Sequence, residues 1–253
     1  MFDLAVGGVG FNQCERFRDQ RGRLAVDFLR RHGVEHRRPL VDPAFELRLG
    51  ESRASVTIGG VPFADELGSG VVVVDYRSEW VTEFELIADV LRSVLGKRAL
   101  VVEHVGSTSV PGLAAKDCID VQVRVRLLDE DELVRLMSEV GFRCRPEAWN
   151  RVEVSSGVEC RKLVFAPPVG GRTCNVHLRI GDGPNVRFAL LFRDYLRADD
   201  AARTGWGAFK KRLAMSASDL FDYGQIKAPA TEVLMAGAER WALETNWSPH
   251  PSH

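Results

Sequence analysis

The sequence predicts an α+β fold, in which a mixed β-sheet is covered by helices. Strand-like patterns dominate the earlier part of the main domain and three helical patterns come last, an order that argues against a doubly wound α/β fold. Hydrophobic residues make up 45% of the 253 residues, which is ordinary for a globular protein with a core. At about 150 residues for a typical domain, this length corresponds to one or two domains.

The main domain is expected over residues 71–247. Apolar spacing predicts, in chain order, a buried strand at 71–74, a helix from Trp80 to Leu95, strands at 99–105 and 118–125, a helix at 129–140, strands at 161–165 and 173–180, and helices at 186–196, 200–215 and 231–245. The first helix is expected to end at Gly96, because glycine commonly follows the last helical turn. A proline–glycine turn joins the strands at 161–165 and 173–180 and predicts a hairpin.

Residues 1–70 have a different pattern of apolar residues and glycines from the rest of the chain, and this pattern predicts a small α/β region. They contain a short strand at 2–6, a glycine-rich turn, a helix that ends at Gly33, and a hairpin of strands at 45–49 and 54–58. Because this region encloses only a small core, we expect it to dock on the main domain. The tail, residues 248–253, is expected to be disordered.

The composition argues against several classes of protein. The net charge of −1 gives no overall field for nucleic acid or a membrane. No run of about 18 apolar residues predicts a membrane span, and the N-terminus lacks the basic region of a signal peptide. The five cysteines are odd in number and form no CxxC pair. They predict reduced thiols in a cytoplasmic protein, and neither a disulfide framework nor a zinc site.

A run of eight arginines between Arg16 and Arg38 is the best candidate for a nucleic-acid interface. Acidic residues at positions 15, 19, 27 and 35 interleave with it. This alternation favours a solvated helix face over a surface that binds tRNA or another nucleic acid.

The stretch EHVGSTSVPG, residues 103–112, follows a predicted strand and concentrates glycine and hydroxyl residues. Gly106 would let the backbone approach a ligand closely, and Ser107 and Thr108 offer hydroxyl and N–H donors that suit a phosphate. The stretch is not a P-loop, because it lacks GxxxxGK[ST]. Taken alone, it fits an ordinary tight turn closed by Pro111 and Gly112.

The next strand adds a carboxylate beside this loop. Strand alternation places Asp120 and Gln122 on one face of the sheet. An aspartate next to a glycine–serine turn is the arrangement that holds a nucleotide phosphate beside Mg²⁺, which prefers oxygen ligands and shares them with phosphates. Without the glycine–serine turn beside it, Asp120 would be interpreted as a residue at the end of a strand that caps a loop.

The stretch EHVGSTSVPGLAAKDCIDVQV, residues 103–123, resembles the signature of the GrpB family, which is assigned to the nucleotidyltransferase superfamily. The segments VVVVDYRSEWVTEFE (71–85), CNVHLRI (174–180) and RFALLFRDYLRAD (187–199) are similar to other parts of the family, as are Tyr223 and Lys227. The resemblance covers residues 71–247. Residues 2–70 bear a fainter resemblance to the start of peptidyl-tRNA hydrolase, but Val9 and Asp19 stand near the places of the expected Asn and His, so no hydrolase activity follows.

The superfamily pattern is a glycine–serine turn, an Asp-x-[Asp/Glu] strand and a third carboxylate on a later strand. The resemblance assigns the turn to Gly106 and Ser107, and it implies Mg²⁺ at Asp120 and Gln122 with ATP or another NTP as substrate. The third position falls on Asn175 or His177, which share a strand face. An amide and a histidine thus stand where carboxylates are expected, and catalysis by two metal ions relies on anionic ligands.

Other basic residues complete the predicted site. Lys116 precedes the Asp120 strand and suits a phosphate as a point charge. Arg179 shares a strand face with His177, which also suits a general base. The remaining candidates for phosphate contacts, in helical segments, are Arg187, Arg193 and Lys227. For the arginines the alternatives are a solvated face or a local ion pair, such as one between Arg193 and Asp194. His104 is expected to be structural.

Three functions are compatible with these residues. The first is Mg²⁺-dependent transfer of a nucleotidyl group from an NTP to an acceptor, with Asp120, Gln122 and His177 as catalytic residues. The second is a non-catalytic module that binds a nucleotide or another phosphorylated small molecule. The third is acyl or aminoacyl transfer with His177 as base. Phosphate binding at Gly106 and Ser107 is favoured over transfer itself, because carboxylates are missing.

Overall fold

The computed structural model describes residues 70–249. The predictions for residues 1–69 and 250–253, including the N-terminal region and its resemblance to peptidyl-tRNA hydrolase, lie outside the described residues. The main elements are, in chain order, α2 (Glu79–Leu95), β1 (Ala99–Val105), the 3₁₀ turn η4 (Ser107–Ser109), β2 (Ile119–Val125), α3 (Glu130–Glu139), β3 (Arg143–Cys144), β4 (Val152–Ser155), β5 (Val158–Ala166), β6 (Cys174–Ile180), α4 (Pro184–Ala198), α5 (Asp200–Ser216) and α6 (Leu220–Thr245).

The sheet is mixed, with strand order β1-β2-β6-β5-β3, and β4 pairs with the first half of β5. Only β2 and β6 are parallel; the other neighbouring strands described are antiparallel. A parallel pair needs a long connection, and α3 with strands β3–β5 supplies it. The α+β fold with a mixed sheet is therefore confirmed.

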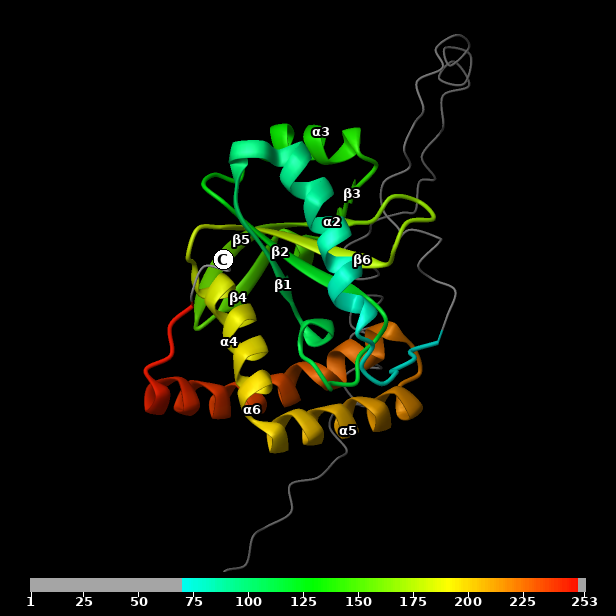
Figure 1. Cartoon of the computed structure of the whole chain (residues 1–253), viewed down its shortest axis with the longest axis vertical. Coiled ribbons are helices and arrows are strands. Elements are labelled where there is room, and N and C mark those ends of the chain that lie inside the picture. Colours follow the sequence, from blue (N-terminus) through cyan, green and yellow to red (C-terminus); the bar gives the residue numbers. More distant parts are fainter. Residues whose placement is uncertain (1–69, 250–253) are drawn as a thin grey trace, which may run out of the picture. The chain divides into compact units, whose positions relative to one another are not determined.

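Helices α2 and α3 cover one face of the sheet (Figure 1). Apolar residues of α2 recur every three or four positions, and the stripe includes Trp80, Phe84 and Leu91. These side chains pack on alternate residues of the central strands, such as Val121 and Val176. Because strand side chains alternate between faces, the residues between them point to the opposite side.

Helices α4, α5 and α6 build the other half of the domain. In α4, Val186 and Leu190 pack on Val105 at the end of β1. The loop after β1 packs on α4 and α5, where Val110 contacts a cluster that includes Trp206. Figure 1 shows α5 and α6 next to this loop, below the sheet. Side chains of both helices can therefore reach the loop.

Several predicted elements are corrected by the structure. Residues 71–74 form no strand: Val74 makes an isolated bridge with Ala115, and Val72 is 63% exposed. The last helix begins at Leu220 and contains Pro229, whereas a start at residue 231 was predicted. A proline inside a helix removes one hydrogen bond, but the packing of α6 on α4 and α5 retains the helical path here.

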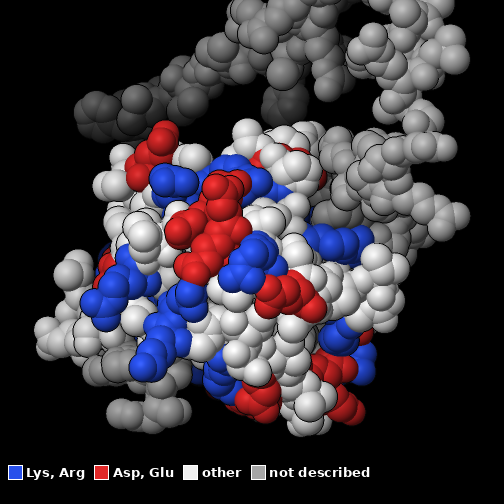
Figure 2. Space-filling model, turned by 90° about the horizontal axis from the view of Figure 1, so that it is seen from above, with Lys and Arg blue, Asp and Glu red and all other residues white. Residues whose placement is uncertain are grey.

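No helix in residues 70–249 is long and apolar enough to cross a membrane. Figure 2 shows acidic and basic side chains interspersed over the face seen from above. This face has no field of a single sign, so it gives no support for binding a polyanion such as nucleic acid.

Candidate phosphate-binding site

The sheet face that points toward α4 is lined by polar side chains. The parallel register pairs Asp120 with Asn175 and Gln122 with His177. The antiparallel register on the other side of β2 pairs Gln122 with Glu103. The prediction that Asp120 and Gln122 share one face is thus confirmed, and the face divides into two regions of different charge balance.

The first region is a buried charge network in which every charge has an opposite partner. We define the network as Glu103, Gln122, Arg124, Glu153, Lys162 and Arg179. Arg124 donates to both carboxylate oxygens of Glu103, at 3.0 and 2.6 Å. Glu153 accepts from both Lys162 and Arg179. Burial acts to raise the pKa of Glu153, but these two cations outweigh it and lower the pKa to about 2.

Gln122 and Arg179 belong to this network and face each other. The Gln122 side chain is fully buried; its Oε1 accepts from Arg179 at 2.7 Å and its Nε2 donates to Glu103 at 3.0 Å. Arg179 also donates to Glu153. Both ends of the amide are engaged, so the structure does not bring Gln122 or Arg179 to an open ligand site.

The second region begins at the loop after β1, where Gly106 lies directly over Asp120. The φ of Gly106 is +69°, and a Cβ at this position would lie 2.4 Å from Asp120 Oδ2. Residues other than glycine rarely adopt this φ, and none would fit above the carboxylate. Glycine is therefore required because the loop closes onto Asp120, and close approach of this backbone to a ligand stays a prediction.

The three hydroxyls of the loop have different tasks. The Thr108 hydroxyl is buried and lies 3.0 Å from His104 Nε2, and Ser109 donates to the Gly106 carbonyl. His104 stacks on Phe84 of α2, and burial lowers the pKa of His104 to about 4, which fits a neutral structural residue. Ser107 is partly exposed and accepts a hydrogen bond from Lys210 of α5 at 2.8 Å. Thr108 thus secures the loop, and Ser107 is the hydroxyl that faces the site.

Three lysines converge on this region, and we call Lys116, Lys210 and Lys227 the lysine cluster. Lys210 is only 3% exposed. Its burial, together with the charges of Lys227 and Lys116, lowers the pKa of Lys210 to about 7, although Asp120 opposes the shift. The ammonium groups of Lys116 and Lys227 lie 5.6 and 6.0 Å from the ring centre of Tyr223. Burial and Lys116 also lower the pKa of Lys227.

Asp120 lies between the lysine cluster and strand β6. Its Oδ1 accepts from Asn175 at 3.2 Å and lies 3.9 Å from His177 Nε2. Burial acts to raise the pKa of Asp120, but the interactions with His177 and Asn175 outweigh it, so the carboxylate is ionised. Burial lowers the pKa of His177, and its Nδ1 is buried without a hydrogen-bond partner among the described residues.

Residues 70–236 match the family model described as GrpB protein. The chain belongs to the GrpB family. A crystal structure of the conserved protein GrpB from Enterococcus faecalis is 30% identical, with a TM-score of 0.56 over 67% of this chain and 99% of that one.

Curated relatives extend the comparison. UPF0157 protein BH1888 of Halalkalibacterium halodurans is 33% identical over 66% of this chain and 80% of that protein. A dephospho-CoA kinase of Mycolicibacterium paratuberculosis is 34% identical over 75% of this chain and 52% of that protein. The chain thus spans about half the length of this relative, and a similar share of the Mycobacterium dephospho-CoA kinases.

Two arginines predicted for the GrpB site are engaged elsewhere. Arg187 forms an ion pair with Glu239 of α6. Arg193 forms an ion pair with Asp194 and donates to the carbonyl of His104 at 3.3 Å. The alternative of a local ion pair thus describes Arg193 in this structure, and neither arginine joins the lysine cluster.

The donor set of the site does not match the two-metal centre that the superfamily resemblance implies. Residues 70–249 contain no group of three or more His, Cys, Asp or Glu side chains that could hold a metal ion. Oδ1 of Asn175 accepts from Arg145 at 3.0 Å and Oε1 of Gln122 accepts from Arg179, so neither amide oxygen next to Asp120 is open. Paired metal ions need several anionic ligands.

Sequence reasoning missed Lys210, although a signal was present. Lys210 lies four residues after Trp206 and three before Leu213, so helical spacing places it on the buried stripe of α5. A lysine on an apolar stripe is rarely buried without a partner. Its neighbour Lys211 lies outside the stripe and pairs with Asp75 at the surface.

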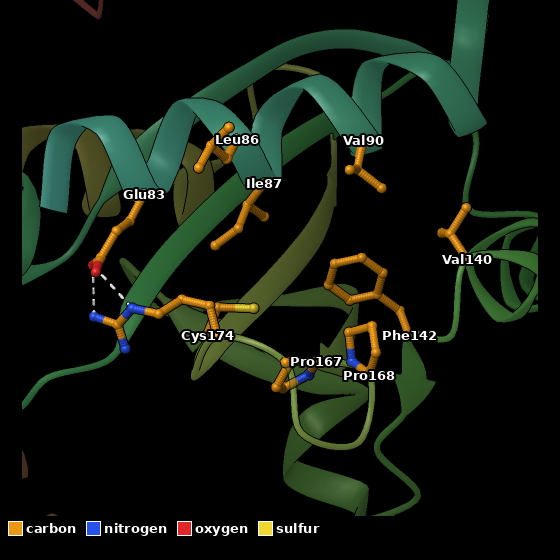
Figure 3. A pocket seen from close by; sticks show the side chains of 11 residues that line it. Glu83, Leu86, Ile87, Val90, Val140, Phe142, Pro167, Pro168 and Cys174 are labelled. Atoms are coloured by element: carbon orange, nitrogen blue, oxygen red, sulfur yellow. Dashed lines mark hydrogen bonds and ion pairs between the residues drawn. The ribbon is translucent and has the colours of Figure 1, made fainter. Parts of the chain in front are cut away.

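An apolar pocket of about 320 Å³ lies on the opposite side of the sheet from the lysine cluster. Figure 3 shows Leu86, Ile87 and Val90 of α2 facing Phe142 and Pro168 across it. An ion pair between Glu83 and Arg172 closes one end. This pocket carries no open polar group comparable with the lysine cluster, so it is not the candidate site.

Proposed function

We propose that the lysine cluster binds the phosphate groups of a nucleotide or a related phosphorylated small molecule. The observation that carries this proposal is the buried ammonium group of Lys210, which donates to the neutral hydroxyl of Ser107. Lys162 and Lys211 pair with carboxylates, whereas no ion pair within residues 70–249 involves a member of the lysine cluster. Buried charges are normally paired, so an anion supplied by a ligand would complete the site.

The charge of the cluster supports a ligand with more than one phosphate. Three ammonium groups face one carboxylate, that of Asp120, which acts on both Lys210 and Lys227. Lysine binds phosphate as a mobile point charge, and several lysines can neutralise a diphosphate or triphosphate. Nucleoside triphosphates are also the substrate class that the superfamily resemblance implies.

The test is calorimetric titration of the full chain with ATP, AMP and inorganic pyrophosphate. We expect ATP and pyrophosphate to bind, and Lys210→Met to weaken both by at least tenfold. Lys211→Met is the matched control, because it removes the adjacent lysine from an exposed ion pair and should leave affinity unchanged. Absence of binding to the wild-type chain, or equal effects of the two substitutions, would refute the proposal.

A second candidate function, group transfer from the bound compound, is favoured by His177. Its Nδ1 lacks a partner and its Nε2 faces the Asp120 carboxylate, an arrangement that suits an unprotonated base oriented by an acid. Nδ1 is buried in the ligand-free structure, so the site must open before this nitrogen can accept the proton of an acceptor hydroxyl. Catalytic hydrogen bonds are often long before substrate binds, which is compatible with 3.9 Å.

A single variant, His177→Gln, distinguishes phosphate binding from group transfer. His177→Gln leaves the lysine cluster untouched, so pyrophosphate should bind as in the wild type. If the chain transfers a group, turnover of ATP with cell-extract acceptors, followed by mass spectrometry, should fall at least a hundredfold. Full turnover in His177→Gln would exclude this role of the histidine.

A further inference from the structure

We infer that the lysine cluster holds the phosphate groups without a divalent metal ion. This inference rests on the proposed function and specifies how the same site works. In it, the ammonium groups of Lys116, Lys210 and Lys227 neutralise the phosphate oxygens directly. The superfamily resemblance had implied Mg²⁺ at Asp120 and Gln122, and the two arrangements make opposite demands on Asp120.

The oxygen donors near Asp120 are already used. Mg²⁺ takes about six oxygen ligands in octahedral geometry, several of them from water and substrate phosphates and the rest from one or two carboxylates of the protein. Gln122 Oε1 accepts from Arg179, and Asn175 Oδ1 accepts from Arg145, so neither amide oxygen is open. Of the side chains of Ser107, Asp120, Gln122 and Asn175, only Asp120 then offers a charged oxygen, and the Ser107 hydroxyl already accepts from Lys210.

A fixed organic cation already occupies the place next to the second ligand position. Arg179 Nη1 lies 2.7 Å from Gln122 Oε1, the one atom of that side chain able to coordinate a metal. Arg179 is held there by two hydrogen bonds to Glu153 and is 7% exposed. A guanidinium is always charged, so it would repel a metal ion placed on the same oxygen.

The lysine cluster repels a metal ion from the other side. Lys116 acts on the charge of Asp120, and Asp120 acts on Lys210 and Lys227, so all three lysines lie within electrostatic reach of this carboxylate. A divalent ion on Asp120 would face these ammonium groups. A polyphosphate, by contrast, would be attracted by the lysines and repelled by Asp120.

The decisive experiment compares Asp120→Asn with the wild-type full chain. Inorganic pyrophosphate and ATP are titrated in excess EDTA and in excess Mg²⁺. We expect wild-type binding to persist in EDTA with an affinity at least equal to that in Mg²⁺. We expect Asp120→Asn, which removes the repelling charge without changing shape, to bind three- to tenfold more tightly in EDTA.

Two further variants locate the binding groups. Lys116→Met and Lys227→Met should each weaken binding in EDTA by at least tenfold. Wild-type binding that requires Mg²⁺, and is lost in EDTA and in Asp120→Asn, would overturn the inference while leaving phosphate binding intact. Absence of binding under both conditions would instead refute the proposed function and, with it, the inference. Thermal unfolding of each variant establishes that the fold is retained.

Discussion

The charge network and the lysine cluster lie on the same sheet face but are balanced differently. In the network, each buried cation has a carboxylate, as in the pairing of Arg124 with Glu103. In the cluster, Lys210 is equally buried yet bonds to a neutral hydroxyl. The comparison teaches that burial of charge alone does not mark a ligand site. What distinguishes the cluster is that none of its lysines forms an ion pair within residues 70–249, which is why we propose an anionic ligand there.

The largest expected loss of stability comes from removing one carboxylate of the charge network. Glu103→Gln leaves Arg124 buried with one partner, Asp182, which is 82% exposed. Removing one partner of a buried pair costs about 3–5 kcal/mol, so we expect a loss near 3 kcal/mol in urea-induced unfolding. Glu139→Gln, which breaks the exposed pair with Arg135, should cost less than about 0.5 kcal/mol. Equal losses would show that the network is not a buried structural unit.

In the lysine cluster, by contrast, we expect a substitution to increase the free energy of unfolding. Lys210→Met removes a buried charge that has no ion-pair partner within residues 70–249, and it should stabilise the ligand-free protein by up to about 4 kcal/mol at pH 7. Because the pKa of Lys210 is about 7 in the folded chain and 10.5 in the unfolded chain, the unfolded state binds more protons between these values. Wild-type stability therefore rises with pH over this window, and the advantage of the variant shrinks. If the stability difference between Lys210→Met and the wild type stayed constant or grew between pH 7 and 10, the low pKa of Lys210 would be contradicted.

A smaller destabilisation is expected at the loop. Gly106→Ala places a Cβ against the Asp120 carboxylate at a positive φ and should cost roughly 1–3 kcal/mol of stability. It should also weaken pyrophosphate binding, because Asp120 and Ser107 would shift. Gly205→Ala in α5, where a Cβ meets nothing within 4 Å, should stabilise by about 0.4–1 kcal/mol. Matching signs in the two variants would refute the proposed packing of Gly106.

The last expected effect is confined to acid pH and comes from the titration of Glu153. Its folded pKa is about 2, below the ordinary value of 4.5, so its contribution to stability is complete above pH 4.5. That contribution is lost as the pH falls from 4.5 toward 2. Glu153→Gln should flatten this part of the stability profile, and an unchanged slope would exclude Glu153 as its source.

The sequence predicted most of the fold, because its elements have strong local signals. The α2 stripe and the alternation in β2 are both present in the structure. The two-residue strand β3 and the four-residue β4 were missed, since short strands depend on partners distant in sequence. The prediction of a strand at 71–74 was wrong for a related reason, because this segment lacks a full strand partner.

The candidate site was only partly predictable. Strand alternation gave Asp120 its place beside Asn175 and His177, and the loop motif pointed to Ser107. The role of Gln122 could not be predicted from spacing, because its two partners lie on β1 and β6, which only the sheet register brings to either side of β2. Lys210 required knowledge that α5 packs beside the loop, since it lies 103 residues from Ser107.

The most direct test of the central claim measures proton uptake on binding. Inorganic pyrophosphate is titrated into the full chain at pH 8 in two buffers of different ionisation enthalpy. Because Lys210 has a pKa near 7 before binding, a bound anion should raise it and draw a proton from the buffer. We predict uptake of a substantial fraction of one proton in the wild type and in Lys211→Met, and none at this position in Lys210→Met. Binding with equal proton uptake in all three chains, or no binding at all, would contradict the account.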